Sequence, residues 1–341
     1  MPTMRVYRLP QAGRIEDLTL GEAERPTAGH GQAVVRLRAA SLNYRDLMII
    51  RNQYGSPARP GLVPLSDGAG EVVEVGPGVT RVKVGDRVAG IFHQGWIGGE
   101  ISDEMARTAL GGDLDGVLAE YRAFDEDGLV PLPEGLSFEE GATLPCAAVT
   151  AWDALMWGSR PVRPGDTVLT QGTGGVSVFA IQFAAAAGAR VISTSSSDEK
   201  LGRARALGAT DTINYRATPD WEKEVQRLTD GRGVDHVVEV GGPGTLPRSL
   251  RSVRRGGTVN VIGLLTGGGG EINPLVLIPR AAIMRGIYVG SREMFLDMNR
   301  AIVASGIKPV IDRTFDFDRA AEAYRHLDSG AHFGKVVIRI S

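Results

Sequence analysis

The glycine-rich stretch from residue 167 to residue 200 constrains the fold more than any other part of the sequence. It reads TVLTQGTGGVSVFAIQFAAAAGARVISTSSSDEK, in which two apolar strands flank an alanine-rich helix. The glycines lie where the first strand gives way to the helix. A strand, a glycine loop, a helix and a second strand form a βαβ unit, which is the context that a dinucleotide fingerprint requires. The stretch therefore predicts a parallel sheet that binds a nucleotide at this loop.

Each glycine of the loop has an expected role. Gly172 allows the tight turn, and Gly174 lets the backbone approach a pyrophosphate held by the amides of the helix N-terminus. Gly175 gives further room, and Val176 follows in the same cofactor-binding turn. The third glycine of the motif is replaced by Ser177, a small polar residue. The alternative is a glycine turn without a nucleotide, but a second strand at βαβ spacing favours the cofactor.

The end of the second strand indicates which cofactor is used. An acidic residue there would bind the ribose 2′-hydroxyl of NAD and repel the 2′-phosphate of NADP. This chain has Ser195 and Ser196, then a third serine, and Lys200 supplies a positive charge. Asp198 and Glu199 work against this interpretation, and Lys200 could simply be a solvated helix lysine. We expect NADPH to be preferred, with NAD possible.

The rest of the chain divides into two kinds of pattern. Up to about residue 125, short valine-rich runs alternate with glycine and proline, as in antiparallel strands joined by turns, whereas strands alternate with helices after residue 150. The tail returns to the first pattern. We predict an α/β fold with a β-rich domain at 1–147 and 291–341, interrupted by a doubly wound parallel-sheet domain at 148–290. Residues 94–115 fit neither pattern and predict a loop or lid.

Composition limits the classes of partner. With 38 basic and 40 acidic side chains, the chain shows no electrostatic preference for nucleic acid or for anionic lipid. No apolar run is long enough to span a membrane or to act as a signal peptide. The single cysteine excludes an intrachain disulfide. We therefore expect a cytoplasmic protein whose partner is a small molecule.

Several motifs together resemble those of a known superfamily. They are TQGTGGVS, NYRD, PLSDGAGEVVEVG, VKVGDRV and HFGKVV. In this order they resemble the medium-chain dehydrogenase/reductase superfamily, over nearly the whole chain except residues 94–115. The zinc-independent quinone oxidoreductase-like branch, together with NAD(P)-dependent alcohol dehydrogenase-like members, is the most similar part. The resemblance implies a GroES-like catalytic domain, a Rossmann domain, an active site in the cleft between them, and a homodimer formed through the cofactor domain.

The resemblance also implies that zinc is absent. Cys146 matches the second cysteine ligand of the zinc-dependent alcohol dehydrogenases, while Asn43 and Ser66 take the places of the first cysteine and of the histidine. One thiol with an amide and a hydroxyl does not make a zinc site. The four cysteines of the structural zinc lobe are missing too. We expect Cys146 to be a small buried apolar residue rather than a reactive thiol.

The resemblance assigns roles to residues near the substrate. Asn43 would hydrogen-bond the nicotinamide ribose or the substrate oxygen, although it could equally cap a helix. Tyr54 would donate a proton to the substrate oxygen, or is a surface aromatic in a turn. Asp67 stands where the zinc enzymes have a glutamate and would orient its neighbours. Lys335 belongs to a signature near the cofactor.

Further cofactor contacts follow from the same resemblance. Thr150 would face the nicotinamide carboxamide, and Tyr215 with Lys200 would bracket the 2′-phosphate. Gly241 and Gly263 end later strands of the parallel sheet, and cofactors lie at that edge.

Without a metal, charge that develops on a carbonyl oxygen must be met by hydrogen bonds alone. Quinones and α,β-unsaturated carbonyls delocalise that charge and need such help least. We predict a metal-free oxidoreductase that passes hydride from NADPH to one of these. The alternatives are an NAD(P)-dependent alcohol dehydrogenase, which would act on alcohols, ketones or aldehydes, and an NADPH-binding protein without significant turnover.

Overall fold

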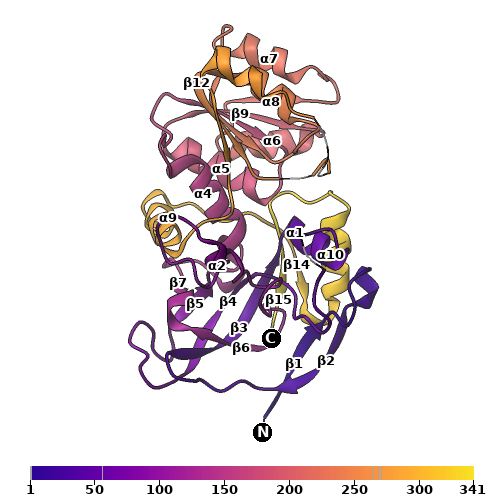
Figure 1. Cartoon of the computed structure of the whole chain (residues 1–341), viewed down its shortest axis with the longest axis vertical. Helices are drawn as coiled ribbons and strands as arrows, with labels where there is room; N and C mark the ends of the chain where they lie inside the picture. The colour runs from indigo at the N-terminus through magenta and orange to yellow at the C-terminus, as the bar shows by residue number, and fades with distance from the viewer. Residues whose placement is uncertain (1, 56, 264, 268, 270) are drawn as a thin grey trace. The chain divides into compact units, whose positions relative to one another are not determined.

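The computed structural model describes residues 2–55, 57–263, 265–267, 269 and 271–341. The chain forms two compact units (Figure 1). The first unit comprises Met1–Val149 and Gly290–Ser341, and the second comprises Thr150–Val289. The first is rich in β-strands and the second alternates strands with helices, so the predicted α/β fold class is confirmed. No helix in the described ranges has the length and apolar character needed to cross a bilayer.

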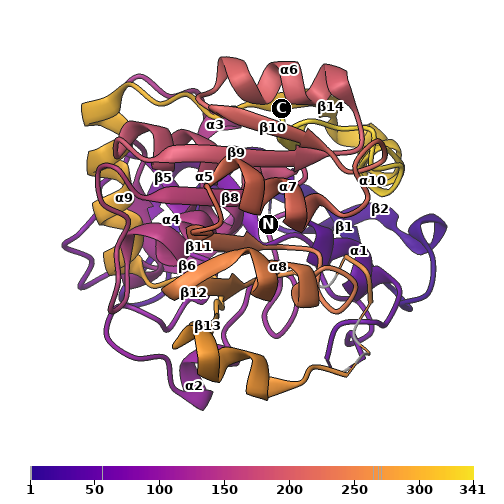
Figure 2. The same ribbon diagram turned by 90° about the horizontal axis from the view of Figure 1, so that it is seen from above.

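The second unit is built on a six-stranded parallel sheet in the order β10-β9-β8-β11-β12-β13. Figure 2 shows the strands following one another in this order. The chain order reverses between β8 and β11, which makes this point the topological switch where α/β sheets bind their ligands. The strands are β8 (Thr167–Gln171), β9 (Arg190–Ser195), β10 (Asp211–Asn214), β11 (Val234–Glu239), β12 (Val253–Val261) and β13 (Ile283–Gly286).

Helices cover this sheet, and every residue of β8 and β11 is buried, as expected of central parallel strands. Leu169 of β8 and Val234 and Val237 of β11 form one core with Trp221 and Leu250 from the helices. The helical segments are α4 (Val149–Met156), α5 (Gly175–Ala186), α6 (Asp198–Ala206), α7 (Trp221–Leu228), α8 (Leu246–Ser252) and the 3-10 helix η4 (Pro274–Arg280).

The first unit contains a seven-stranded sheet in the order β14-β15-β3-β4-β5-β7, with β6 also paired to β3. The C-terminal strand β15 pairs antiparallel with β3, from Val336 opposite Leu42 to Arg339 opposite Ala39, so the last strand of the chain joins strands from its first third. A hairpin of β1 (Thr3–Arg8) and β2 (Thr19–Glu24) lies outside it. The sheet strands are β3 (Gln32–Leu42), β4 (Asp67–Val75), β5 (Arg87–Gly90), β6 (Tyr121–Asp125), β7 (Leu129–Pro131), β14 (Ile311–Asp316) and β15 (Lys335–Arg339).

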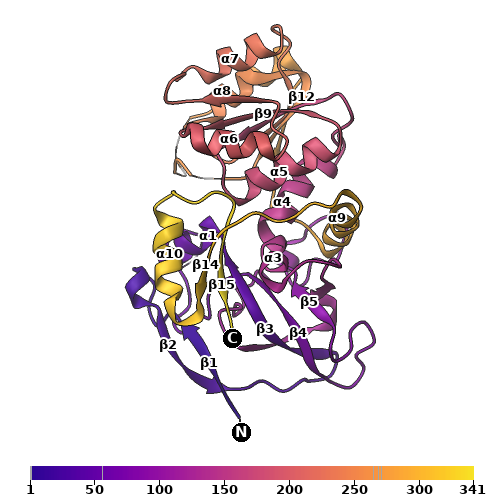
Figure 3. The same cartoon turned by 180° about the vertical axis from the view of Figure 1, so that it is seen from behind.

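Helix α10 packs on β14 and β15 (Figure 3), and its Tyr324 is completely buried in the core of this unit. The remaining short 3-10 turns are η1 (Ile15–Asp17), η2 (Glu126–Gly128) and η5 (Phe317–Arg319). The other helical segments are α1 (Tyr44–Ile50), α2 (Asp103–Ala106), α3 (Phe138–Gly141), the π-helix η3 (Leu144–Ala148), α9 (Arg292–Ser305) and α10 (Ala320–Asp328).

Residues 94–115 are irregular apart from the single turn of α2. Backbone hydrogen bonds tie the segment to the start of α9: the N–H of Arg292 donates to the carbonyl of Trp96 (2.9 Å), and that of Glu293 donates to Ile97 (3.0 Å). The Trp96 side chain is buried, and its indole N–H donates to Gly99. The segment is therefore a loop with its own anchor within the first unit.

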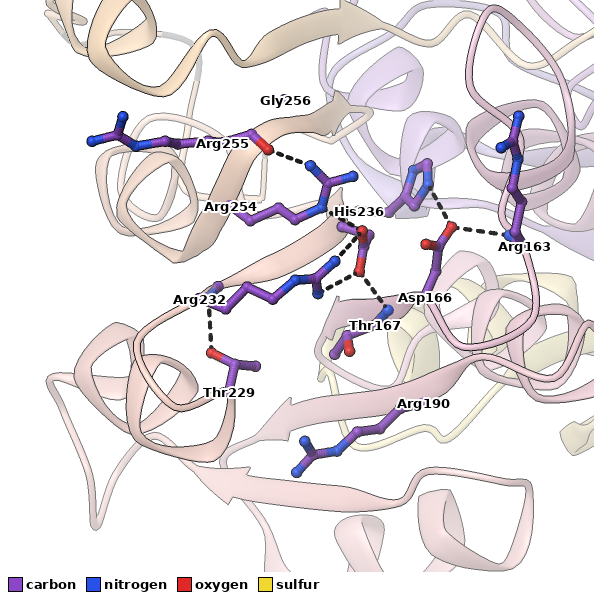
Figure 4. A network of polar contacts seen from close by, with 12 residues as sticks. Arg163, Asp166, Thr167, Arg190, Thr229, Arg232, His236, Arg254, Arg255 and Gly256 are labelled. Atoms are coloured by element: carbon purple, nitrogen blue, oxygen red, sulfur yellow. Dashed lines mark hydrogen bonds and ion pairs between the residues drawn. The ribbon is translucent and has the colours of Figure 1, made fainter.

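A buried carboxylate organises the edge of the second unit where β8, β11 and β12 begin (Figure 4). Asp235 is completely buried and accepts hydrogen bonds from Arg160 (3.1 Å), Arg232 (3.0 Å) and Arg254 (2.5 Å). Despite burial, the guanidinium groups of Arg232 and Arg254 and the backbone N–H of Thr167 hold the pKa of Asp235 well below its usual range. The next residue, His236, is also completely buried, and Nε2 lies 3.8 Å from the Asp166 carboxylate.

Candidate active site

The predicted cofactor loop connects β8 to α5. Gly172 has a φ of 68°, a conformation that favours glycine, and its N–H donates to the carbonyl of Thr194 (2.8 Å). Gly174 is the N-cap of α5, and a Cβ added there would meet no heavy atom within 4 Å. Gly175 and Val176 form the first turn of α5. The start of α5 therefore leaves room for a phosphate beside its first amides, at the topological switch point of the sheet.

The structure explains why serine serves at the third motif position. Ser177 is buried, and its hydroxyl donates to the carbonyl of Gln171 at the end of β8 (2.7 Å). A small side chain is needed because α5 packs closely on β8, and the hydroxyl gains a partner in that tight space. The departure from glycine is thus compatible with the dinucleotide fold.

The residues predicted to select NADP gather at the ends of β9 and β10. Ser195 is the last residue of β9, and its carbonyl accepts the N–H of Tyr215 (3.0 Å), which directly follows β10. Ser196 continues the chain toward α6, and Lys200 lies in the first turns of that helix. These four residues therefore share one edge of the sheet.

The two acidic residues of this edge differ in their surroundings. The Asp198 carboxylate accepts a hydrogen bond from the Asn214 side chain (2.8 Å), so part of its charge is compensated within the protein. Glu199 is exposed on the first turn of α6.

A buried glutamate that sequence reasoning missed shapes the end of β11. Glu239 is completely buried and accepts from the backbone N–H groups of Gly241 (2.9 Å) and Gly242 (3.0 Å), from Gln171 (2.8 Å) and from Thr245 (2.5 Å). It ties the end of β8 to the loop after β11. The only available signal was a carboxylate that follows two valines near the end of the strand DHVVEVGG.

The remaining predicted residues of the second unit are glycines required by packing, and a threonine. A Cβ on Gly241 would lie 2.2 Å from Thr245 Oγ1, and one on Gly263 would lie 2.1 Å from the carbonyl oxygen of Val240. The N–H of Gly241 is bonded to Glu239, and its cofactor contact stays a prediction. Thr150 is buried near the start of α4.

Two of the three predicted catalytic residues, Asn43 and Asp67, belong to a hydrogen-bonded network at the starts of α1 and β4. Asn43 is the N-cap of α1, which agrees with the alternative that it caps a helix. Its backbone N–H donates to the Asp46 carboxylate (2.7 Å). Its carboxamide faces two other partners. Lys335 Nζ donates to Asn43 Oδ1 (2.5 Å), and Asn43 Nδ2 lies 3.5 Å from Ser66 Oγ.

Asp67 orients its neighbours, the role that the resemblance gave it. The Ser66 hydroxyl donates to Asp67 Oδ1 (2.6 Å), and the backbone N–H of Cys146 donates to Oδ2 (3.0 Å). Burial and the Asp67 carboxylate raise the pKa of the Cys146 thiol, which keeps its proton. Cys146 is only partly buried, which corrects the expectation of a buried residue.

The three positions that match zinc ligands do share this network, but their donors do not suit zinc. The Asn43 oxygen already accepts a hydrogen bond from an ammonium group, and the Ser66 hydroxyl donates a hydrogen bond to Asp67. Zinc prefers thiolate, imidazole and carboxylate ligands. Within the described part of the chain, no three histidine, cysteine or acidic side chains gather as a possible metal site.

Tyr54 lies against Arg45, a buried arginine that sequence reasoning did not single out. The Arg45 guanidinium is 5.2 Å from the centre of the Tyr54 ring and 4.7 Å from that of Phe92, and it donates to the carbonyl of Leu110 (3.0 Å). Arg45 also pairs with buried Asp46 (3.5 Å), whose pKa burial raises to about 6. Tyr54 is partly buried, so it is more than an exposed turn residue.

Comparison with known proteins agrees with this architecture. Residues 29–134 match the alcohol dehydrogenase GroES-like domain, and residues 175–304 match the zinc-binding dehydrogenase family. A zinc-type alcohol dehydrogenase-like protein of Schizosaccharomyces pombe is 48% identical over 91% of each chain. A parallel sheet with a glycine loop at its switch point, in one chain with a GroES-like unit, is the fold of a nucleotide-dependent dehydrogenase or reductase.

Solved structures extend the similarity. A putative alcohol dehydrogenase from Sinorhizobium meliloti superposes with a TM-score of 0.92 at 41% identity, covering 100% of this chain and 99% of that one. A Pseudomonas syringae quinone oxidoreductase gives 0.84 at 30% identity, with 99% and 100% covered. A crotonyl-CoA carboxylase/reductase in complex with NADP gives 0.85 at 25% identity, with 99% and 95% covered. The chain belongs to the medium-chain dehydrogenase/reductase superfamily, and it is an oxidoreductase.

Proposed function

We propose that this protein is a metal-free oxidoreductase that uses NADPH to reduce a quinone or an α,β-unsaturated carbonyl compound. The main support is the network at the zinc-ligand positions, where Asn43 and Ser66 are held by Lys335 and Asp67 in an arrangement that disfavours a metal ion. Without a Lewis acid, the site must rely on hydrogen bonds to stabilise negative charge on a substrate oxygen. Conjugated acceptors spread that charge and make the smallest demand on the site.

The chain's own residues supply binding and orientation. The loop from Gly172 and the start of α5 would hold the pyrophosphate of the cofactor. When bound, NADPH supplies the hydride. The Asn43 carboxamide would donate an N–H to the substrate oxygen, and the proton that completes the reduction would come from water or from the Tyr54 phenol.

The preference for NADPH rests on the edge formed by β9 and β10. Ser195 and Ser196 offer hydroxyl donors for a phosphate, and Lys200 and Tyr215 lie on the same edge. The hydrogen bond from Asn214 to Asp198 lessens the negative charge that would oppose a 2′-phosphate. NAD remains the second choice of cofactor.

An alcohol dehydrogenase that acts on simple alcohols and ketones is the second candidate, because relatives carry that description. The two functions separate in one assay: NADPH consumption by purified, metal-free protein with a quinone, a conjugated enone and a plain ketone side by side. Turnover of the quinone or enone but not the ketone supports the proposal. Turnover of the ketone alone, or tightly bound zinc in the purified protein, refutes it.

We further propose that the protein is a homodimer formed through the second unit. Strand β13 lies at the edge of the six-stranded sheet, and its Ile283 and Met284 are exposed by 44% and 41%. Nearby η4 exposes Leu275 and Ile278 by 64% and 72%. An open strand edge with apolar side chains is suited to pairing with a second copy.

Light scattering after size-exclusion chromatography tests the dimer. Ile278→Glu should yield monomers, whereas the control Val84→Glu, at an exposed valine of the first unit, should leave the mass unchanged. A monomeric wild-type protein, or a dimer that survives Ile278→Glu, would contradict the interface.

A further inference from the structure

Lys335 is a buried cation whose position is set by the backbone around it. Gly334 has a φ of 84°, and a Cβ there would lie 2.4 Å from the carbonyl oxygen of Val310, so this position requires glycine. The N–H of Lys335 donates to the same carbonyl (2.9 Å) and begins β15. The side chain is only 3% exposed, and Nζ donates to the carbonyl of Leu42 and to Asn43 Oδ1, both at 2.5 Å.

The ammonium group fixes which way the Asn43 carboxamide faces. With Oδ1 bound to Lys335, a flipped amide would direct its N–H donors at three N–H donors of the ammonium. The Nδ2 group therefore stays on the opposite side, where Ser66 Oγ lies at 3.5 Å. Nδ2 carries two N–H groups, and it faces Ser66 and the Asp67 carboxylate, so the amide turns its donor end, and not its oxygen, away from Lys335.

The same ammonium balances buried negative charge. Asp46 and Asp67 are almost completely buried, and the positive charge of Lys335 opposes the rise that burial causes in the pKa of each. Arg45 supplies a second buried cation beside Asp46. A hydrogen bond from a cation also polarises the Asn43 amide, which strengthens its N–H as a donor.

We propose that Lys335 is a positioning residue for the reduction, acting through Asn43. It holds the Asn43 N–H toward the acceptor oxygen and supplies a fixed positive charge at the positions where zinc-dependent relatives hold their metal. The inference rests on the proposed function, and it specifies a substrate oxygen that gains negative charge. Hydride adds to the β-carbon of the conjugated carbonyl, the π electrons shift to form the enolate oxygen, and the enolate takes a proton from water or Tyr54.

Two variants of the lysine test this role. Lys335→Gln keeps an amide donor for Leu42 and Asn43 but removes the charge, and Lys335→Met removes both. We expect kcat for an enone or quinone to fall by about 10- to 100-fold in Lys335→Gln, less than the loss of a whole oxyanion donor costs, because the Asn43 N–H stays but loses the charge that polarises it. The Michaelis constant for NADPH should change by less than about threefold, because the lost interaction acts on the transition state.

A matched control lies on the same pair of strands. Ser41→Ala removes a buried hydrogen bond from the Ser41 hydroxyl in β3 to the carbonyl of Val336 in β15 (3.1 Å) but leaves Lys335 in place. This variant should keep the wild-type kcat even if its melting temperature falls. An equal loss of kcat in Ser41→Ala would show that the strand pairing matters and the ammonium does not.

A double-mutant cycle separates positioning from a general effect of charge. If Lys335 acts through Asn43, adding Lys335→Gln to Asn43→Ala should lower kcat far less than it does in the wild type. Independent, multiplicative losses would overturn the inference.

A readout without turnover separates this inference from the proposed function. In protein labelled with ¹⁵N-asparagine, the side-chain amide signals of Asn43 should shift or broaden in Lys335→Gln and stay in place in Ser41→Ala. If the wild type reduces no quinone or enone, the proposed function fails, and the amide signals still decide whether Lys335 orients Asn43. An unchanged kcat in Lys335→Gln, or unmoved amide signals, refutes the positioning role.

Discussion

Lowering the pH from 7.5 to 5.0 should destabilise the second unit through His236. This side chain is completely buried, and burial beside Arg160 lowers its pKa from 6.5 to about 4. The unfolded chain therefore takes up a proton near pH 6.5, while the folded chain resists protonation until about pH 4. Stability is thus fully present above pH 6.5 and is lost as the pH falls toward 4.

The size of this loss follows from the two pKa values. At pH 5.0 the histidine is almost fully protonated when unfolded and mostly neutral when folded, which corresponds to about 2 kcal/mol. We expect His236→Phe to remove this pH dependence, and neither ring nitrogen has a hydrogen-bond partner among the described residues to lose.

Hydrogen exchange followed by mass spectrometry can measure the effect in peptides from β11 and the neighbouring strands. In the wild type, their free energy of opening should fall by about 2 kcal/mol between pH 7.5 and 5.0, after correction for the intrinsic exchange rate. Peptides of the first unit provide a positive control in His236→Phe. They contain buried His93, whose pKa burial also lowers to about 4, so they should keep their own pH dependence. The reasoning is wrong if β11 peptides lose the same stability in His236→Phe.

Three further substitutions test other parts of the second unit. Gly174→Ala should cost about 1 kcal/mol of stability or less, because this N-cap position has open space for a Cβ. It should still raise the Michaelis constants for both NADPH and NADH, and unchanged constants would contradict a pyrophosphate at this loop. Lys200→Ala should raise the constant for NADPH about tenfold and leave that for NADH nearly unchanged, and equal effects on both would refute its phosphate role. Asp235→Asn should lower the free energy of unfolding in urea titrations by about 3 to 5 kcal/mol, because three guanidinium groups lose their buried counter-charge. A loss below about 1 kcal/mol would contradict the stabilising role of this carboxylate.

The fold class could be predicted from sequence because its signals are local. The glycine loop between TVLTQ and the alanine-rich helix identifies a βαβ unit without any knowledge of distant contacts. Ser177 also could be judged locally, since a small side chain is what the contact between α5 and β8 needs. The predicted NADP residues come together because each lies at the end of a strand or the start of a helix, positions that the strand pattern already fixed.

The polar partners could not be predicted because they depend on contacts between distant segments. Lys335 and Asn43 are 292 residues apart, and only the pairing of β15 with β3 brings the ammonium to the carboxamide. Glu239 and Asp235 both stand in β11, which the sequence pattern predicts to be an apolar strand. Their partners come from the strands β8 and β12 and from two loops. Arg45 gave no signal either, because a charged residue after a helix start is ordinarily solvated, whereas here it is buried beneath Tyr54 and Phe92.

The residues at the zinc-ligand positions and Lys335 are best understood as one electrostatic arrangement. The ammonium group lies 2.5 Å from the Asn43 oxygen, so a divalent ion bound by the same residue would lie within two hydrogen-bond lengths of it, roughly 5 Å. At that distance the repulsion between charges of +2 and +1 is on the order of 7 kcal/mol at an effective dielectric constant of 20. This repulsion is comparable to the whole stability of many domains. The lysine and a metal ion are therefore alternative sources of positive charge at one place. The hydrogen bonds of Asn43 and Ser66 are those expected when the lysine supplies that charge.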